Sequence, residues 1–513
     1  MVRVKSNPGK WGVLYMTSFA MFIMTIDMTM MNVSISALVS DLHTTVQGIQ
    51  LSIALYTLVM AAFMIIGAKL ADIMGTKKVF VSGLLIYGIG TTMATFAPNI
   101  TVLILGWSIL EGIGASMMMP VTITYITKTY DGVDRAFAFS VWSAIGGAAA
   151  AFGPIIGGFF TTYITWRLGF GMEVLIVIGM FAKMGILRDY PPKRRIKLDV
   201  IGAALVATGL FMVTLSILLI DPLGESPVLG VFSIGLAFLF LFFFWERRME
   251  SHGKDPLLNL RLFKSRNFVL GNVVSIFFQI TLAGAMFTLP IFLQNVAGYS
   301  AMNTGLTVLP LSIMMFIFSI YGEKVMKYLS PKQIIQIGIL LSIGGLVLLY
   351  IVFSPYTDGW HLAPGLALYG TGLGLVFSQI TNLTMAGASE RDKAEASGVF
   401  NSQKQLGMSL GTAFIGAVLV LGMIRYITYY IYSSGIFPNE SKEEIRRRVI
   451  DWLIRMKQGN LMILPDQMQK VQELSNWALA NAMKDAVIFM IISLLIGAVL
   501  SLWLPDNIEE MVV

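Results

Sequence analysis

The sequence predicts an all-α integral membrane protein. Its 513 residues are 56% hydrophobic and only 13% charged, whereas soluble proteins are about half apolar and about a quarter charged. The apolar residues also form long runs, and a hydrocarbon core about 30 Å thick needs about 20 of them for each spanning helix. The chain has no cysteine, which excludes disulfides and thiolate metal sites.

Each apolar run predicts one spanning helix. The first follows a short basic segment and is too long for a cleaved signal sequence, so we interpret it as a membrane helix. Pro290 interrupts one later run, and another is unusually long. The fourteen runs lie near residues 11–35, 48–68, 79–97, 100–124, 138–163, 168–187, 200–220, 228–245, 269–293, 302–322, 333–353, 363–384, 395–424 and 485–504.

Basic residues fall in alternate breaks between these runs. Examples are the pairs Lys77 and Lys78, and Arg247 and Arg248, whereas short breaks such as 97–100 contain no lysine or arginine. The positive-inside rule then places both termini in the cytoplasm and predicts a multi-pass protein of the cell membrane. The formal net charge of +7 therefore marks membrane flanks, and we expect no nucleic-acid partner.

The break at 433–484 is much longer than the others. Ser441 and Glu444 form a plausible capping box before an amphipathic pattern. Pro465 interrupts the pattern, and a second amphipathic stretch leads into the last run. We expect an extracellular helical hairpin, lying on the bilayer surface or over the pore mouth. A plain connector and a lid or partner-docking element remain alternatives.

Three carboxyl side chains, Asp27, Glu111 and Glu173, lie within apolar runs, as does Lys404. A charged group facing lipid would cost several kcal/mol, so each must face a cavity or a partner. Asp27 is the strongest candidate because threonines and Asn32 surround it; it could take up a proton or face a cationic ligand. For Glu111 and Glu173, a protonated carboxyl bonded to a neighbouring helix is an equal alternative.

Two further segments suggest conformational roles. In the break between the second and third runs, Asp72 ends a helix, Gly75 permits a tight turn, and Lys77 and Lys78 anchor the next helix. A simple turn is the alternative. The run 140–158 combines small residues at near-helical spacing with one proline, which favours close packing and bending. Its key positions are Gly153, Pro154, Gly157 and Gly158.

Nothing in the sequence predicts an enzyme, and we expect no catalytic residue, no metal and no cofactor. The histidines His43, His252 and His361 are scattered over separate breaks, and no Walker loop is present. The 33 methionines suggest an adaptable lining, with generic membrane packing as the alternative.

These motifs, in this order, resemble the fourteen-helix drug:proton antiporters of the major facilitator superfamily. The segment 67–80 is similar to the family's signature loop, 148–158 to its antiporter motif, and Asp27 with Asn32 to its acidic motif on the first helix. Trp166, Arg167 and Phe170 resemble the opening of the sixth helix. Later landmarks lie at 255–263, 293–310 and 396–407.

The resemblance implies two six-helix bundles, residues 1–190 and 251–513, with two inserted helices within 191–250. It implies proton-driven export of hydrophobic, often cationic compounds by alternating access, with lipophilic substrates and membrane lipids as partners and a monomeric protein. Asp27 would then bind substrate or proton, and Asp72 would gate. The chain departs from the family at Ser108, where an arginine is usual, and at Glu173, where asparagine is common.

Three hypotheses follow from the sequence. The first is a proton-coupled exporter of amphipathic cations, with protonation at Asp27 assisted by Glu111 or Glu173. The second is a transporter of lipids or lipid-like molecules, suggested by the outer hairpin. The third is a sensor or docking protein that keeps the fold without transport.

Overall fold

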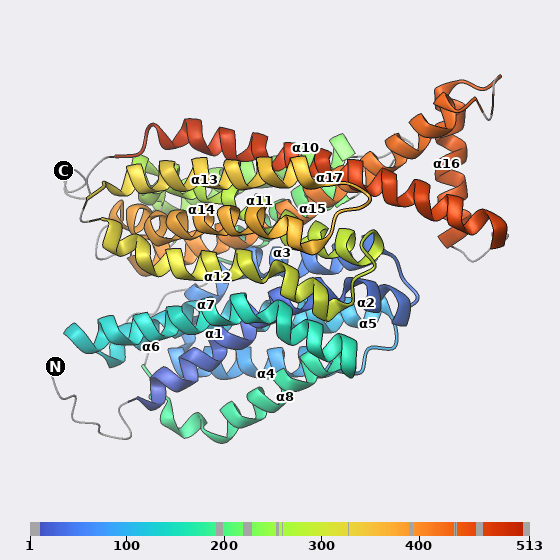
Figure 1. Cartoon of the computed structure of the whole chain (residues 1–513). Coiled ribbons are helices and arrows are strands. Elements are labelled where there is room, and N and C mark those ends of the chain that lie inside the picture. The colour runs from blue at the N-terminus through green and yellow to red at the C-terminus, as the bar shows by residue number, and fades with distance from the viewer. Residues whose placement is uncertain are drawn as a thin grey trace.

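The computed structural model describes residues 11–190, 199–218, 228–252, 256–258, 260–326, 328–388, 393–435, 437, 439–457 and 465–505. Within these residues the secondary structure is entirely helical. Figure 1 shows long helices running side by side in two groups, with both termini at one end of the molecule. The predicted all-α membrane fold is therefore confirmed.

The first group of helices is formed by the N-terminal part of the chain. Its main partners in space are α1 with α7, α3 with α6, and α4 with both α6 and α8. The elements are α1 (Gly12–Met30), η1 (Met31–Ser34), α2 (Ile35–Asp41), α3 (Val46–Met74), α4 (Thr76–Thr95), α5 (Ile100–Leu103), η2 (Ile104–Glu111), α6 (Gly112–Thr129), α7 (Gly132–Tyr163), α8 (Arg167–Ala182) and η3 (Met184–Ile186).

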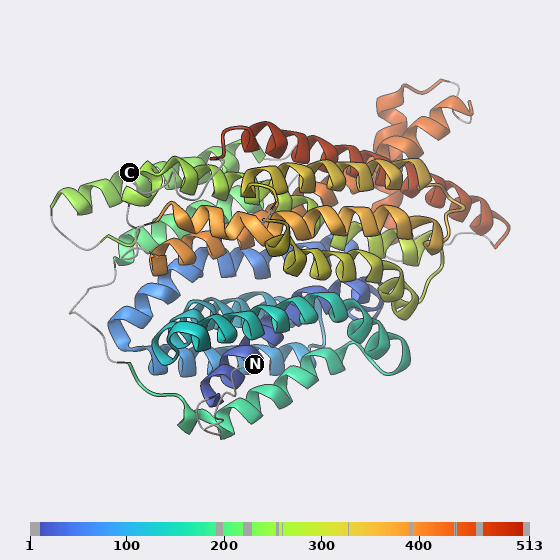
Figure 2. The ribbon, with the colours of Figure 1, turned by 60° about the vertical axis from the view of Figure 1, so that its left-hand side comes forward.

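The second group follows two connecting helices, α9 (Val200–Leu218) and α10 (Val228–Ser251). These two helices pack on each other, and α9 also contacts α3 and α15. Figure 2 shows α9 and α10, coloured green, beside the other helices. The later elements are η4 (Leu260–Lys264), α11 (Arg266–Asn295), α12 (Ala301–Val325), α13 (Pro331–Val352), α14 (Gly359–Ala386), α15 (Lys393–Ser433), α16 (Lys442–Lys457) and α17 (Pro465–Ser501). The predicted bundle boundaries at 190 and 251 stay a prediction.

Twelve helical stretches of the described residues are long and apolar enough to cross a membrane. The other two predicted runs coincide with α8 and α14, which are helical but are not among these twelve. Pro290 lies inside α11 without ending it. The long run near 395–424 is a single helix of 41 residues, α15. The count of fourteen spans is thus a prediction still, whereas the helices themselves are present.

The two ends of the molecule differ, and we name each by a feature. At the Gly75 end, Gly75 joins α3 to α4 with φ of +94°, a conformation that glycine adopts without strain. A side chain there would also approach the Asp189 carboxylate. The predicted tight turn is therefore confirmed. The opposite end carries α16 and is called the α16 end.

At the α16 end, α15 and α17 extend beyond their neighbours and carry α16 across them (Figure 1). The apolar side of α16 is buried: Ile445, Val449 and Ile450 belong to one buried cluster with Ile424 of α15 and Ala478 of α17, and α16 packs mainly on α15. This face is therefore occupied by the protein's own helices. The predicted role of the hairpin as a lid or docking element stays a prediction, and residues 458–464 at its tip lie outside the described residues.

The predicted capping box at the start of α16 is confirmed. The backbone N–H and the hydroxyl of Ser441 both donate to Glu444 Oε2, at 2.7 and 2.8 Å, and the Glu444 N–H donates to Ser441 Oγ at 3.3 Å. The bond from the Ser441 backbone N–H, and to a smaller extent the bond from its hydroxyl, hold the pKa of the Glu444 carboxyl below its ordinary value.

This cap makes the stability of α16 sensitive to acid. Because the pKa of Glu444 is lowered in the folded state, its ionised form stabilises the helix at pH values above the ordinary pKa of glutamate. This stabilisation is lost as the pH falls through the lowered pKa. We expect the protection factors of the amides in the first turn of α16, which compare the observed exchange rates with the intrinsic rates at the same pH, to fall at acidic pH. In Glu444→Gln the same turn should be less protected at neutral pH, with little further change in the protection factors on acidification. Equal pH dependence in both proteins would contradict this.

Candidate functional site

A π-helix lies at the centre of the first group. Residues 104–111 form η2 between α5 and α6. π-Helices are rare in proteins, and those that occur often lie at functional sites. Two glycines bring this segment against α4: a side chain at Gly90 would lie 2.6 Å from the Gly106 carbonyl oxygen, and one at Gly106 would lie 2.8 Å from that of Gly90. The wider turn presents Trp107, Ser108 and Glu111 to the neighbouring helices.

Trp107 holds Asp27 in place. Its indole Nε1–H donates to Asp27 Oδ2 at 2.7 Å, and both side chains are buried. The indole ring lies between Tyr56 of α3, stacked at 5.9 Å, and Phe170 of α8, edge-on at 5.6 Å. Because the ring is fixed on both faces, the orientation of the Asp27 carboxyl is fixed as well.

Glu173 of α8 is held from α4. The Tyr87 hydroxyl donates to Glu173 Oε2 at 2.8 Å, and Thr91 Oγ1 lies 3.4 Å from the same oxygen. Glu173, Tyr87 and Thr91 have no exposed surface. Glu173 therefore fastens α8 to α4, which is one of the two roles that the sequence left open for it.

Glu111 completes a cluster of three carboxyls. It is fully buried, and neither of its oxygens has a hydrogen-bond partner. One oxygen from each of Asp27, Glu111 and Glu173 lies within 4.8 Å of the other two. No lysine, arginine or histidine interacts with these carboxyls in the part of the chain that is described. We call this arrangement the carboxyl triad.

Ser108 stands where the resembling family usually has an arginine. Its hydroxyl donates to the Ser52 carbonyl oxygen at 2.8 Å and lies 2.8 Å from the Ser52 hydroxyl. It thus ties the π-helix to α3. The position supplies no positive charge to the carboxyl triad.

Asn32 is not a member of the carboxyl triad. It sits in η1, one turn beyond α1, and its side-chain amide donates to the Met28 carbonyl oxygen at 2.6 Å. Lys404 of α15 is half-buried on the second group of helices. The binding role predicted for Asn32 remains a prediction.

The glycines of the antiporter-like motif make close contacts on α7. A side chain at Gly153 would clash with Thr29 of α1, and one at Gly157 would lie 2.4 Å from the Met30 carbonyl oxygen. On the other side, a side chain at Gly158 would lie 2.6 Å from the Ala301 carbonyl oxygen of α12. Pro154 lies inside this helix. The motif therefore presses α7 against both α1 and α12.

This contact closes the gap between the two groups near the α16 end. A side chain at Gly305 of α12 would lie 2.3 Å from the Pro154 carbonyl oxygen. The Gln294 amide donates to the Val33 carbonyl oxygen at 2.7 Å, and the Met302 N–H donates to Thr162 Oγ1 at 3.0 Å. The first and second groups are thus bonded together at this end.

At the Gly75 end, a small cleft of about 90 Å³ lies between the two groups. Its walls come from α3, α4 and α6 on one side and from the first turns of α15 on the other. The exposed Asp72 lines it together with Lys69 and Glu395, whereas Lys77 and Lys78 are not among its lining residues. The structure therefore places Asp72 at a cleft, as a gating role requires; the role itself stays a prediction.

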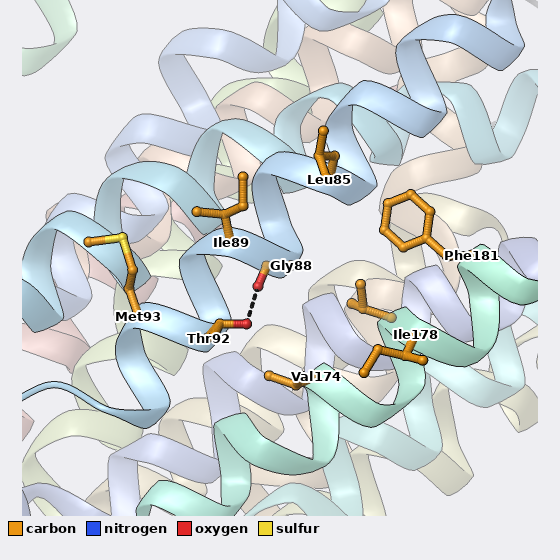
Figure 3. Close-up of a pocket in the computed structure, with 9 residues that line it drawn as sticks. Leu85, Gly88, Ile89, Thr92, Met93, Val174, Ile178 and Phe181 are labelled. Atoms are coloured by element: carbon orange, nitrogen blue, oxygen red, sulfur yellow. Dashed lines mark hydrogen bonds between the residues drawn. The ribbon is translucent and has the colours of Figure 1, made fainter.

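A separate apolar groove lies between α4 and α8 (Figure 3). It has a volume of about 380 Å³, and the half-exposed side chains of Leu85, Ile89 and Ile178 line it. Two of its lining residues, Gly88 and Val174, directly follow Tyr87 and Glu173 in the sequence. Its lining is suited to an acyl chain or another apolar molecule.

Comparison with known proteins decides the family. The profile of the Major Facilitator Superfamily matches residues 17–223 and 190–412. The chain belongs to the major facilitator superfamily. It is therefore a multi-pass membrane protein of a transporter family, without an enzymatic activity, as the sequence predicted. This match does not show whether the chain belongs to the fourteen-helix antiporter branch of the superfamily.

Superfamily members similar to this chain carry drug and antibiotic names. The Multidrug transporter protein MdtP of Bacillus subtilis is 31% identical over 414 residues, which cover 78% of this chain and 73% of that protein. The Methylenomycin A resistance protein of the same species is 26% identical over 417 residues, covering 81% and 88%. The Probable actinorhodin transporter of Streptomyces coelicolor is 27% identical over 424 residues, covering 80% and 72%.

Two solved structures of transporters share the fold. A bacterial homolog of the human lysosomal transporter Spinster, inward-facing and unoccupied, aligns with a TM-score of 0.63 at 14% identity and covers 97% of this chain and 98% of its own. The human organic anion transporter MFSD10 aligns with a TM-score of 0.53 at 12% identity, covering 80% and 94%.

Sequence reasoning identified the three carboxyls but missed the side chains that organise them. Trp107, Tyr56 and Tyr87 lie in apolar runs, where an aromatic residue is ordinary packing. The signal that could have found them is the need of a buried carboxyl for a hydrogen-bond donor on a neighbouring helix.

Proposed function

We propose that the protein exports hydrophobic, cationic small molecules from the cell in exchange for protons. The observation that carries this proposal is the carboxyl triad, which lies in a transporter bundle and has no basic partner among the residues that the structure describes. The names of the relatives support drug-like substrates. The Gly75 end would face the cytoplasm, because lysines and arginines such as Lys77 and Lys78 concentrate there.

The triad favours exchange for an electrostatic reason. Three ionised carboxylates in a dry interior repel one another and lose their hydration, so the closed site must be neutralised. A proton can do this, and so can the positive charge of a substrate. If a proton and a cationic substrate cannot occupy Asp27 together, uptake of protons releases the cation, and this exclusion is the basis of antiport. Glu111 and Glu173 would share the protons.

The two ends of the molecule support alternating access. The structure is bonded shut between α7 and α12 at the α16 end, and a cleft opens at the Gly75 end. A substrate would thus enter from the cytoplasm in this state. Export requires the opposite state, in which the contacts of Gly158 and Gly305 separate and the cleft beside Asp72 closes. Pro154 provides a point where α7 can bend.

Reconstitution of the purified protein tests this function. Proteoliposomes carrying a lipophilic cation and an internal pH dye should show substrate movement accompanied by proton movement in the opposite direction. Counterflow of labelled against unlabelled substrate would also exclude a sensor without transport. Proton movement that does not depend on substrate, or substrate movement that leaves the internal pH unchanged, would reject antiport.

A lipid-like substrate is the second candidate, favoured by the apolar groove between α4 and α8. Replacing Ile178 by tryptophan would fill the groove from its exposed rim. If the groove admits substrates from the bilayer, we expect Ile178→Trp to slow movement of a fluorescent lipid several-fold. The control is Ile492→Trp on α17, where isoleucine is comparably exposed. Equal lipid movement in both variants and the parent protein would remove this candidate.

A further inference from the structure

The carboxyl triad also has the geometry of a metal site. Each of its members keeps at least one oxygen without a hydrogen-bond partner: Asp27 Oδ1, both oxygens of Glu111, and Glu173 Oε1. All three residues are fully buried. Trp107 and Tyr87 bind only the other oxygens of Asp27 and Glu173. These donors therefore orient the carboxyls and leave oxygens free to bind a ligand.

The spacing of the triad is compatible with a single bound ion. One oxygen from each carboxyl lies within 4.8 Å of the other two, so an ion at equal distance from the three oxygens would lie at most about 2.8 Å from each of them, a limit that admits the oxygen–ion distances of Ca²⁺. The preference for Ca²⁺ comes from coordination geometry: Ca²⁺ accepts oxygen ligands at about 2.3–2.6 Å in flexible arrangements, whereas Mg²⁺ demands about 2.0–2.1 Å in a strict octahedron. A ligand set made only of oxygens selects a hard cation.

A second, independent feature points to the same place. The Tyr56 hydroxyl of α3 is buried and has no hydrogen-bond partner. It lies next to Asp27, outside hydrogen-bonding geometry, and its ring is held by stacking on Trp107. A buried polar atom left unpaired costs about 1–3 kcal/mol. As a neutral oxygen ligand, this hydroxyl would gain a partner.

We propose that the carboxyl triad, with Tyr56, binds one divalent cation of the calcium class. The charge supports a divalent ion: when one of the three carboxyls is protonated, Ca²⁺ neutralises the other two, whereas Na⁺ leaves one negative charge in the interior. Calcium takes 6–8 oxygen ligands in flexible geometry, and the four free carboxyl oxygens with Tyr56 supply most of them. We expected no metal from the sequence because its histidines are scattered and it has no cysteine, and carboxyl groups that meet only in the fold do not show in such a pattern.

This inference goes beyond the proposed function, since the triad can bind the ion whether or not the protein couples transport to protons. Protons and calcium compete for the same oxygens, so binding weakens as the pH falls. The titratable groups that face the site are Asp27 of α1, Glu111 of η2, Glu173 of α8, Tyr56 of α3 and Tyr87 of α4.

Equilibrium binding of radioactive Ca²⁺ to the purified full-length protein in detergent tests the proposal. We expect saturable binding of one ion per chain at mildly alkaline pH, released at acidic pH and not displaced by equimolar Mg²⁺ or Na⁺. Glu111→Gln should weaken binding by roughly tenfold or more, since even indirect supports of a metal ligand contribute this much. Because Trp107 adjoins the site, bound Tb³⁺ should also luminesce on tryptophan excitation.

The matched control is Glu246→Gln. Glu246 is a fully buried glutamate on α10 that accepts the Leu258 N–H at 2.8 Å, and it does not belong to the triad. This variant should bind calcium as the parent does. Absence of saturable binding in the parent, displacement by equimolar Mg²⁺ or Na⁺, or unchanged binding in a folded Glu111→Gln protein would overturn the proposal. Because the assay contains no substrate or proton gradient, its result is independent of whether antiport occurs.

Discussion

Replacing Asp27 by asparagine is expected to abolish substrate-induced proton movement in proteoliposomes, down to the level of protein-free liposomes. Asparagine has the size of aspartate, and its side-chain oxygen can still accept the Trp107 indole N–H that Asp27 accepts at 2.7 Å. The fold is therefore expected to survive. What the variant loses is the carboxyl that exchanges a proton for a cation, because an amide does not titrate.

The control for this variant is again Glu246→Gln, which removes a buried carboxyl outside the triad. It should retain both substrate movement and proton movement. Unchanged coupling in a folded Asp27→Asn protein would remove Asp27 from the mechanism. Loss of coupling in both variants would show that neutralising any buried glutamate or aspartate is sufficient, and would remove the special role of the triad.

Replacing Gly305 by valine is expected to stop transport by preventing closure at the α16 end. A Cβ atom at this position would lie 2.3 Å from the Pro154 carbonyl oxygen, so α7 and α12 must move apart. Overpacking of this kind costs about 1–3 kcal/mol, and each 1.4 kcal/mol shifts an equilibrium about tenfold. The population should therefore move toward the state that is open at the α16 end.

Spin labels can measure this shift directly, because the chain has no cysteine of its own. Labels at Tyr163→Cys and Asn303→Cys report the separation of α7 and α12, and their distance should lengthen in Gly305→Val. The control is Gly179→Val on α8, where a Cβ would meet no atom within 4 Å. The same distance distribution in Gly305→Val and the parent would mean that this glycine contact does not set the closed state.

The fold could be predicted because its signals are local. Apolar runs of spanning length, the Ser441–Glu444 cap and the glycine turn at 75 each depend on a few consecutive residues, and the structure confirms them. The number of spans was less certain, since α8 has only 16 residues. Hydropathy alone does not fix the length at which a helix crosses the bilayer.

The candidate site could be predicted only in part. Each carboxyl of the triad stood out because an acid in an apolar run is expensive, but the runs do not show that Asp27, Glu111 and Glu173 meet. Their meeting depends on the π-helix and on the Gly90–Gly106 contact, and neither has a local signature. The same holds for Trp107, whose role comes from a hydrogen bond across 80 positions of sequence.

The central claim is that the protein exchanges a lipophilic cation for protons through the carboxyl triad. It is tested most directly by imposing a pH gradient on proteoliposomes and following uptake of the cation. We predict that the cation accumulates in the acidic compartment, against its own gradient, and that accumulation collapses when an ionophore dissipates the pH difference. Equal cation movement with and without the pH gradient would contradict the account.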